Sequence, residues 1–212
     1  MPGRIPGAPD RRARKRLTAP RAGQRDLEGR AITKLYLDDK FPSRMHTLFI
    51  GVNPGVRSAV IGHYFGGHTN TFWKLFHASG LWPVSITTVD DDKVVLGGFG
   101  FTDTSKRPTP GINGLKKGDF LETKNRIRRI VAGRKPRMVV FVSKTALRAY
   151  LGKKDSRVSY GLQDFKIHDA EVFAVPSTSG ASMADSSYRT KLRWFRRLKE
   201  SLDSRGIRYG PT

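Results

Sequence analysis

Cysteine is absent from the 212-residue sequence, which excludes disulfides, thiolate metal sites and iron–sulfur clusters. Long apolar runs are also missing, since no stretch approaches the roughly 18 residues of a membrane helix. The first residues lack the apolar core of a signal peptide. These absences predict an intracellular protein that uses no cysteine-bound cofactor.

Acidic residues are few for a chain with so many basic ones. Lys and Arg number 40 against 18 Asp and Glu, which gives a formal net charge of +22 and a pI near 10.9. This imbalance favours a polyanionic partner, with nucleic acid as the first candidate, and the alternative is a merely basic protein. Twelve Phe, six Tyr and three Trp argue against disorder of the whole chain.

Basic residues are concentrated at the N-terminus. Residues 1–30 hold nine basic and three acidic side chains and few large apolar ones, a composition typical of a disordered basic tail. Their densest patch, Arg11–Arg16, suits phosphate contacts or a nuclear address, and a solvated tail without a special role is an equal alternative. Residues 31–212 are predicted to form a single domain.

Apolar segments of strand type alternate with amphipathic segments of helix type. Strands are predicted at Thr47–Ile50, Gly98–Thr102, Arg137–Val142 and Glu171–Val175, and helices at Ile32–Leu37, Thr71–Ala78, Asp90–Val95, Asp119–Val131, Lys144–Leu151 and Ser187–Asp203. In helix Asp119–Val131 we expect Leu121 to face inward and Arg126 outward. The alternation predicts an α/β fold with three αβα layers and a mainly parallel central sheet of four to five strands.

Three loops with unusual chemistry follow predicted strands, at Gly51–Gly55, Gly100–Asp103 and Pro176–Ser182. The carboxyl ends of parallel strands lie on one edge, where open α/β sheets bind ligands, so these loops are expected to converge. In the first loop Pro54 biases Asn53 away from helix, and the flanking glycines allow other groups to approach closely. Taken alone, these residues also fit an ordinary turn.

Four motifs, in order, resemble the mismatch-specific uracil/thymine-DNA glycosylases, the second family of the uracil-DNA glycosylase superfamily. They are Gly51-Val52-Asn53-Pro54-Gly55, the loop Gly62-His63-Tyr64-Phe65 through Asn70-Thr71-Phe72-Trp73-Lys74, Gly100-Phe101-Thr102, and Pro176-Ser177-Thr178-Ser179-Gly180. The similarity runs from about Asp39 to Ser204. It implies the fold of uracil-DNA glycosylase and a repair enzyme that flips uracil, or thymine, out of G·U or G·T mispairs.

The resemblance implies monofunctional hydrolysis of the N-glycosidic bond by an oriented water, which leaves an abasic site. It assigns water positioning to Asn53, base contacts to Gly51 and to the backbone N–H groups of Val52 and Phe65, and stacking on the base to the Phe65 ring. An amide accepts no proton at neutral pH, so Asn53 orients water without acting as a strong base.

The last motif is expected to meet the gap that the flipped base leaves in the duplex. Ser179, Gly180, Ala181, Ser182 and Met183 are the candidates for wedging and for contacts to the orphaned guanine. Ala181 is too small to fill a base-sized hole, so Met183 is a possible substitute. Phosphate contacts are assigned to Ser177, Arg189 and Arg193.

One departure from the family pattern falls at Asp103, where relatives usually carry Lys or Asn. A carboxylate at this strand end has two interpretations. As a catalytic group it takes a proton from the attacking water and stabilises the positive sugar. As a structural group it forms an Asx-turn with Thr104 and Ser105.

No cofactor and no metal are expected, because neither Cys nor a carboxylate cluster is evident beside His63 and His68. The expected partner is double-stranded DNA with a G·U or G·T mispair, without a membrane, and the chain is expected to act as a monomer. The expected location is the bacterial nucleoid, or the nucleus in a eukaryote. A non-catalytic nucleic-acid-binding protein on the same fold fits the basic surface equally well.

Overall fold

The computed structural model describes residues 36–152, 158–180 and 187–210. The predicted basic tail, residues 1–30, lies outside the described residues, so its separation from the domain at residues 31–212 stays a prediction. Most of the predicted helix Ile32–Leu37 also lies outside them, and its last two residues are not helical.

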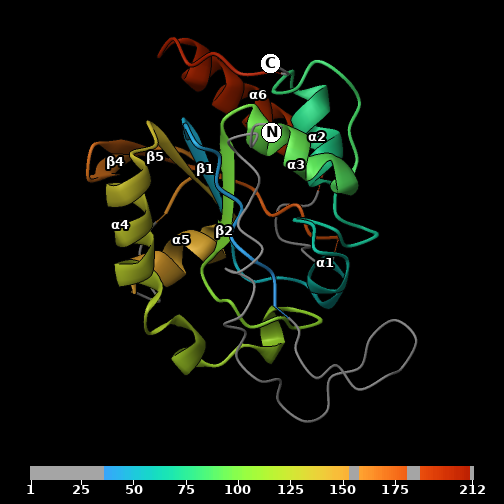
Figure 1. The fold of residues 1–212 in the computed structure, drawn as a ribbon, viewed down its shortest axis with the longest axis vertical. Helices are drawn as coiled ribbons and strands as arrows, with labels where there is room; N and C mark the ends of the chain where they lie inside the picture. Colours follow the sequence, from blue (N-terminus) through green and yellow to red (C-terminus); the bar gives the residue numbers. More distant parts are fainter. Residues whose placement is uncertain (1–35, 153–157, 181–186, 211–212) are drawn as a thin grey trace, which may run out of the picture.

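A five-stranded sheet forms the centre of the molecule (Figure 1). Its strands are β1 Thr47–Gly51, β2 Phe99–Asp103, β3 Met138–Val142, β4 Gly161–Ile167 and β5 Ala170–Val175, in the spatial order β2-β1-β3-β5-β4. All neighbours pair in parallel except β4, which pairs antiparallel with β5. This confirms the predicted mainly parallel sheet. The strand that sequence reasoning missed, β4, is an edge strand with exposed polar positions, so it lacks a continuous apolar run.

Helices cover both faces of the sheet, which confirms the three-layer architecture (Figure 1). They are α1 Val56–Ile61, α2 Phe72–Ala78, α3 Asp91–Leu96, α4 Thr123–Arg134, α5 Lys144–Leu151 and α6 Tyr188–Asp203. Side chains of α2, α3 and α6 pack with Phe49 of β1 on one face, whereas α4 and α5 pack with Leu48 and Ile50 on the other. Alternate residues of one strand thus belong to different cores, as the twofold period of a strand requires.

The face under α2 is rich in aromatic rings. Phe49 lies edge-on to Phe72 and Phe76, with ring centroids 5.3 and 5.8 Å apart, and stacks on Phe101 at 5.8 Å. All four rings are fully buried. Aromatic pairs in these geometries stabilise a core beyond their buried area, so they fix β1, β2 and α2 relative to one another.

The predicted helix Asp119–Val131 is divided in two, and two of its side-chain orientations were wrong. A short 3-10 helix, η4 Lys117–Phe120, precedes α4, so Leu121 lies between them and is 78% exposed. Arg126 was expected in solvent, but it reaches the end of β2 and donates to the Thr102 hydroxyl at 3.0 Å. Leu121 is exposed because η4 and α4 are separate helices, whereas Arg126 flanks the buried face of α4 and is long enough to reach β2.

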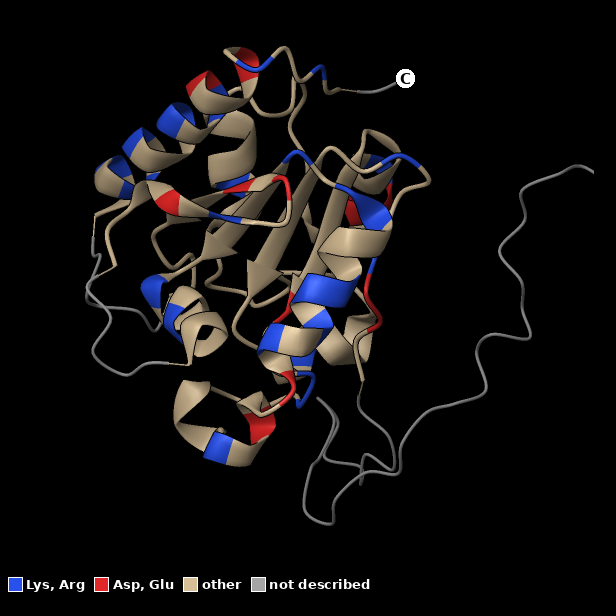
Figure 2. Ribbon diagram, turned by 90° about the vertical axis from the view of Figure 1, so that its left-hand side faces the viewer, with Lys and Arg blue, Asp and Glu red and all other residues tan. Residues whose placement is uncertain are grey.

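Basic residues, coloured blue in Figure 2, recur along α4 and α6. In α6 the apolar stripe of Phe195, Leu198 and Leu202 is buried, while Arg193 and Arg196 remain exposed. Within the described ranges, no helix is long and apolar enough to cross a membrane.

Candidate active site

The candidate site begins where β1 and β2 end side by side. The two strands pair in register, so that Gly51 lies opposite Asp103. Beyond the strands, the Thr104 and Ser105 amides donate to the carbonyls of Gly51 and Val52, at 2.9 and 2.8 Å. These amides are therefore bound to the first motif, and the Asx-turn considered for Asp103 is not formed.

The Asn53 side chain is held in one orientation. Its Nδ2 donates to the carbonyls of Pro54 at 2.9 Å and Arg107 at 3.2 Å, and to the Thr109 hydroxyl at 2.8 Å. The Thr109 hydroxyl in turn donates to the Gly111 carbonyl, so it acts as an acceptor toward Asn53. Because all three partners accept, the amide nitrogen must face them, and Oδ1 faces away as an acceptor for a further ligand.

The Asp103 carboxylate is buried directly above Gly51. Only 3% of the residue is exposed, and its Oδ2 is buried without a hydrogen-bond partner among the described residues. A Cβ at position 51 would overlap Oδ1, so only glycine leaves room for this carboxylate. Burial raises the pKa of Asp103 to about 7, with Lys106 acting to lower it and Asp39 to raise it.

Three charged residues that sequence reasoning missed surround this carboxylate. Asp39 Oδ1 accepts from the Thr102 hydroxyl at 2.6 Å and from Lys106 Nζ at 2.8 Å, and Arg126 lies 3.5 Å from Asp39 Oδ2. Arg126 also donates to the Asp103 carbonyl. No local motif marks these residues, because Asp39 and Arg126 are far from Asp103 in sequence and meet it only through the sheet and α4.

Phe65 also lies beside Gly51. Its ring stacks on Phe72 with centroids 3.8 Å apart, and its Cε1 lies 3.9 Å from the position that a Cβ of residue 51 would take. Its φ of 54° is left-handed, an unfavourable conformation for a bulky side chain. The ring and the Asp103 carboxylate thus both lie against Gly51.

The loop that carries Phe65 is anchored by a buried aspartate, Asp91, at the start of α3. Asp91 accepts from the Tyr64 amide at 2.8 Å, from Lys40 Nζ at 2.7 Å and from His63 Nδ1 at 2.6 Å. Sequence reasoning overlooked this carboxylate, and with it Asp92, beside His63. The Lys40 ammonium pairs with both Asp91 and Asp92 and balances their negative charge. These ion pairs therefore anchor the loop.

Residues 176–180 of the last motif lie against Thr69 and Thr71, at the end of the loop that carries Phe65. The Thr178 carbonyl accepts from the Thr71 amide at 2.9 Å, and a Cβ on Gly180 would overlap Thr69. Ser177 is half-buried and Ser179 is exposed. The other wedge candidates, Ala181, Ser182 and Met183, lie outside the described residues. Arg189 and Arg193, the predicted phosphate contacts, are exposed on α6.

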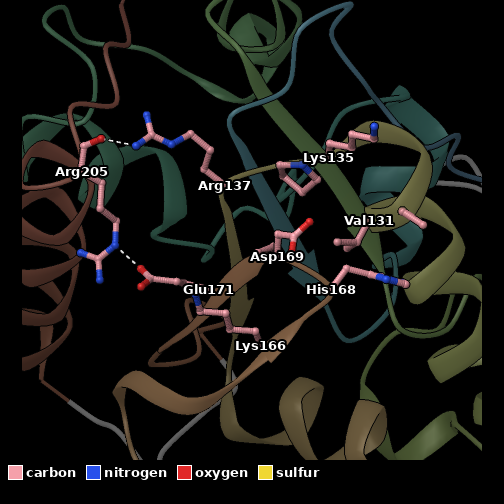
Figure 3. A pocket seen from close by; sticks show the side chains of 11 residues that line it. Val131, Lys135, Arg137, Lys166, His168, Asp169, Glu171 and Arg205 are labelled. Carbon is pink, nitrogen blue, oxygen red and sulfur yellow. Dashed lines mark hydrogen bonds and ion pairs between the residues drawn. The ribbon is translucent and has the colours of Figure 1, made fainter.

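A cavity of about 500 Å³ lies at the opposite edge of the sheet (Figure 3). Lys135, Arg137, Lys166 and His168 surround Asp169 there, at the amino ends of β3 and β5. Arg205 pairs with Glu171 in its wall. This cavity shares no residue with the group formed by Gly51, Phe65 and Asp103, so it takes no part in the candidate site.

The fold and the site define a three-layer α/β protein with a polar ligand site at the carboxyl ends of its parallel strands. The family model of the uracil DNA glycosylase superfamily matches residues 39–202. The chain therefore belongs to this superfamily, as its motifs indicated.

Two individual comparisons accompany the family match. A G/U mismatch-specific uracil DNA glycosylase of Schizosaccharomyces pombe is 27% identical over 157 residues, which cover 70% of this chain and 48% of that protein. The chain thus matches about half the length of this curated relative. A solution NMR structure from Methanosarcina acetivorans, described as a uracil DNA glycosylase, aligns with a TM-score of 0.49 and 20% identity, covering 78% of this chain and 98% of that one.

Gly51→Ala should destabilise the protein because the new methyl group overlaps the Asp103 carboxylate. Overpacking of a buried position costs about 1–3 kcal/mol. In an Asp103→Ala background the overlapping oxygen is gone, and Gly51→Ala should have a clearly smaller effect. Urea unfolding of the four proteins of this cycle measures the difference, and equal effects in both backgrounds would contradict the contact.

Asp103→Asn should stabilise the protein, and increasingly so as the pH rises. The folded-state pKa of about 7 lies above the ordinary value of 3.8, so the folded form holds a proton that the unfolded form releases. Between about pH 4 and pH 7 the wild type therefore loses stability relative to the neutral variant, and above pH 7 the difference is constant. Denaturation of both proteins at pH 5 and pH 8 checks this, and a pH-independent difference would be inconsistent with the raised pKa.

Proposed function

We propose that this chain is a monofunctional DNA glycosylase that hydrolyses the N-glycosidic bond of uracil in a G·U mispair. The observation that carries the proposal is the pairing of a fixed amide, Asn53, with a buried carboxylate of raised pKa, Asp103, at one sheet edge. Membership of the superfamily supports it, as does the similarity to a relative described as G/U mismatch-specific.

In the proposed reaction the uracil is flipped out of the duplex, which costs least at a mispair. The base stacks on Phe65 and lies beside Gly51 and the Asp103 carboxylate, which occupies the space that a side chain at position 51 would need. Backbone N–H groups of Val52 and Phe65 donate to the base oxygens as negative charge develops on them. Such donors favour departure of the base as an anion.

Two residues act on the water in different ways: Asn53 orients it and Asp103 accepts its proton. Asn53 Oδ1 accepts a hydrogen bond from the water and thereby points an oxygen lone pair toward C1′ of the sugar. Ionised Asp103 takes the proton as the C1′–O bond forms, and the electron pair of the C1′–N1 bond leaves with the base. A carboxylate with a pKa of about 7 is well matched to a general base at neutral pH. Its negative charge also stabilises the developing positive sugar.

We further propose that the protein acts as a monomer on double-stranded DNA, with G·T mispairs as a second substrate, in a bacterial nucleoid. The net charge of +22 supports a DNA partner. Exposed Arg189 and Arg193 on α6, together with Ser177, are the proposed phosphate contacts.

Asp103→Ala should lower the single-turnover rate on a G·U duplex by about 10²-fold or more, the effect of losing a positioned base. The wild-type rate should rise with pH toward about 7 and then level, because only the ionised carboxylate accepts the proton. Asn53→Ala should retain measurable activity, since Asp103 still acts on the water. Alkali cleavage of the product, at saturating enzyme, measures these rates.

Asp169→Ala, at the opposite edge of the sheet, is the matched control and should cleave at the wild-type rate. Thermal melts confirm that each variant folds. A wild-type protein that binds the duplex without cleaving it would instead support the non-catalytic binding protein. Wild-type rates in Asp103→Ala would make the carboxylate structural and leave Asn53 as the water-positioning group.

Borohydride should trap no covalent adduct between the protein and G·U DNA. Lys74 is exposed on α2, and Lys106, the lysine beside Asp103, is ion-paired with Asp39 at 2.8 Å. The Lys106 Nζ is therefore engaged with a carboxylate rather than free to attack the sugar. A labelled adduct on a denaturing gel would refute monofunctional chemistry, and Lys106→Ala would then test its origin.

A further inference from the structure

Base flipping leaves a gap in the duplex, and proteins that distort DNA commonly fill such gaps with an apolar side chain. In this chain the expected wedge position holds Ala181, whose methyl group is too small for the gap. A residue other than Ala181 therefore has to supply the apolar group if the gap is filled.

The turn that precedes η4 presents such a side chain. It runs from Thr109 through the short 3-10 helix η3, Ile112–Gly114, and Ile112 is 54% exposed. The Thr109 amide donates to the Pro54 carbonyl at 3.2 Å, and its hydroxyl accepts from Asn53 at 2.8 Å. The turn is thus attached directly to the water-positioning residue.

These bonds limit how far Ile112 lies from the reaction. The Thr109 hydroxyl donates to the carbonyl of Gly111 at 2.7 Å, and Ile112 is the next residue. The lengths of the two hydrogen bonds and of the covalent bonds between them add up to an upper limit of about 10 Å for the distance from Asn53 Nδ2 to the Ile112 Cα. At this distance a side chain can enter the stack while the flipped base is held against Phe65.

The turn is also held firmly and flanked by positive charge. The Gly114 amide donates to the Gly111 carbonyl at 3.1 Å, and Arg107, which donates to the Gly114 carbonyl, pairs with Asp119 at 2.9 Å. Lys116 and Lys117 follow and are exposed. A rigid apolar tip beside exposed lysines can enter the stack while the lysines contact phosphates.

We propose that Ile112 is the side chain that enters the DNA stack and fills the gap left by the flipped uracil. The inference rests on the proposed glycosylase function and adds to it a second DNA-contacting element, distinct from the Pro176–Gly180 motif. In this arrangement Ile112 enters the stack, and the flipped base stacks on Phe65 beside Gly51.

Ile112→Ala should slow single-turnover cleavage of a G·U duplex by about tenfold or more and change cleavage of single-stranded uracil DNA by less than about twofold. A single strand has no stack to open, so it does not need a wedge. A duplex with 2-aminopurine next to the uracil reports flipping directly, and its fluorescence gain should be reduced in the variant.

Leu121→Ala is the matched control, because Leu121 is apolar, 78% exposed and lies in the same connection between β2 and α4. It should behave as wild type, whereas Ile112→Leu should retain most of the activity. Met183→Ala tests the rival wedge in the same assays.

Three results would overturn the inference. Equal losses on duplex and single strand would show that Ile112 acts on the catalytic geometry. Unchanged duplex cleavage and flipping in Ile112→Ala would make it an ordinary exposed side chain. Loss in Met183→Ala alone would assign the wedge to Met183. Failure of the wild type to cleave either substrate would refute the proposed function, while the 2-aminopurine signal would still test the wedge.

Discussion

The parallel pairing of β1 with β2 places a carboxylate over a glycine, and the candidate site is organised around that contact. Register puts Asp103 opposite Gly51, and the absent side chain at Gly51 is the space into which the carboxylate fits. Phe65 Cε1 lies 3.9 Å from the position of that missing Cβ, an ordinary contact distance. A Cβ at position 51 would therefore displace the carboxylate and not the ring, so it is Asp103 that requires the glycine.

The burial that gives Asp103 its raised pKa also opposes folding once the carboxylate ionises. Lys106 and Arg126 moderate this conflict without removing it, because these two cations lower the pKa of Asp103, whereas Asp39 raises it further. Asp103 Oδ2 nevertheless has no hydrogen-bond partner among the described residues. Buried polar atoms are usually satisfied, and exceptions concentrate at functional sites. The aromatic core beneath β1 and β2 supplies the stability that allows such an exception.

Much of the fold was predictable because the buried strands β1, β3 and β5 are short apolar runs that end at glycine, serine or proline. Ser143, a residue type that favours helix N-caps, precedes α5, and its hydroxyl accepts from the Ala146 amide at 3.1 Å. In contrast, β4 carries Gln163, Asp164 and Lys166, which hide an edge strand. Part of the site was predictable, because Asn53 and Asp103 lie at the ends of strands. Arg126 and Asp91 reach the site from α4 and α3, and no sequence pattern encodes such contacts.

Thr109 connects the two activities that the site must coordinate. Its hydroxyl accepts from the Asn53 amide and donates to the Gly111 carbonyl, so one side chain fixes both the water-positioning group and the turn that bears Ile112. A displacement of the turn changes the acceptor that orients Asn53. In the proposed reaction, entry of the turn into DNA and alignment of the water are therefore mechanically linked. With an undamaged pair the base stays stacked, the turn has no gap to enter, and Asn53 meets no flipped base. Under this proposal, selectivity for mispairs arises from the energy of opening the duplex, and the chemistry of the base is read only after it has left the stack.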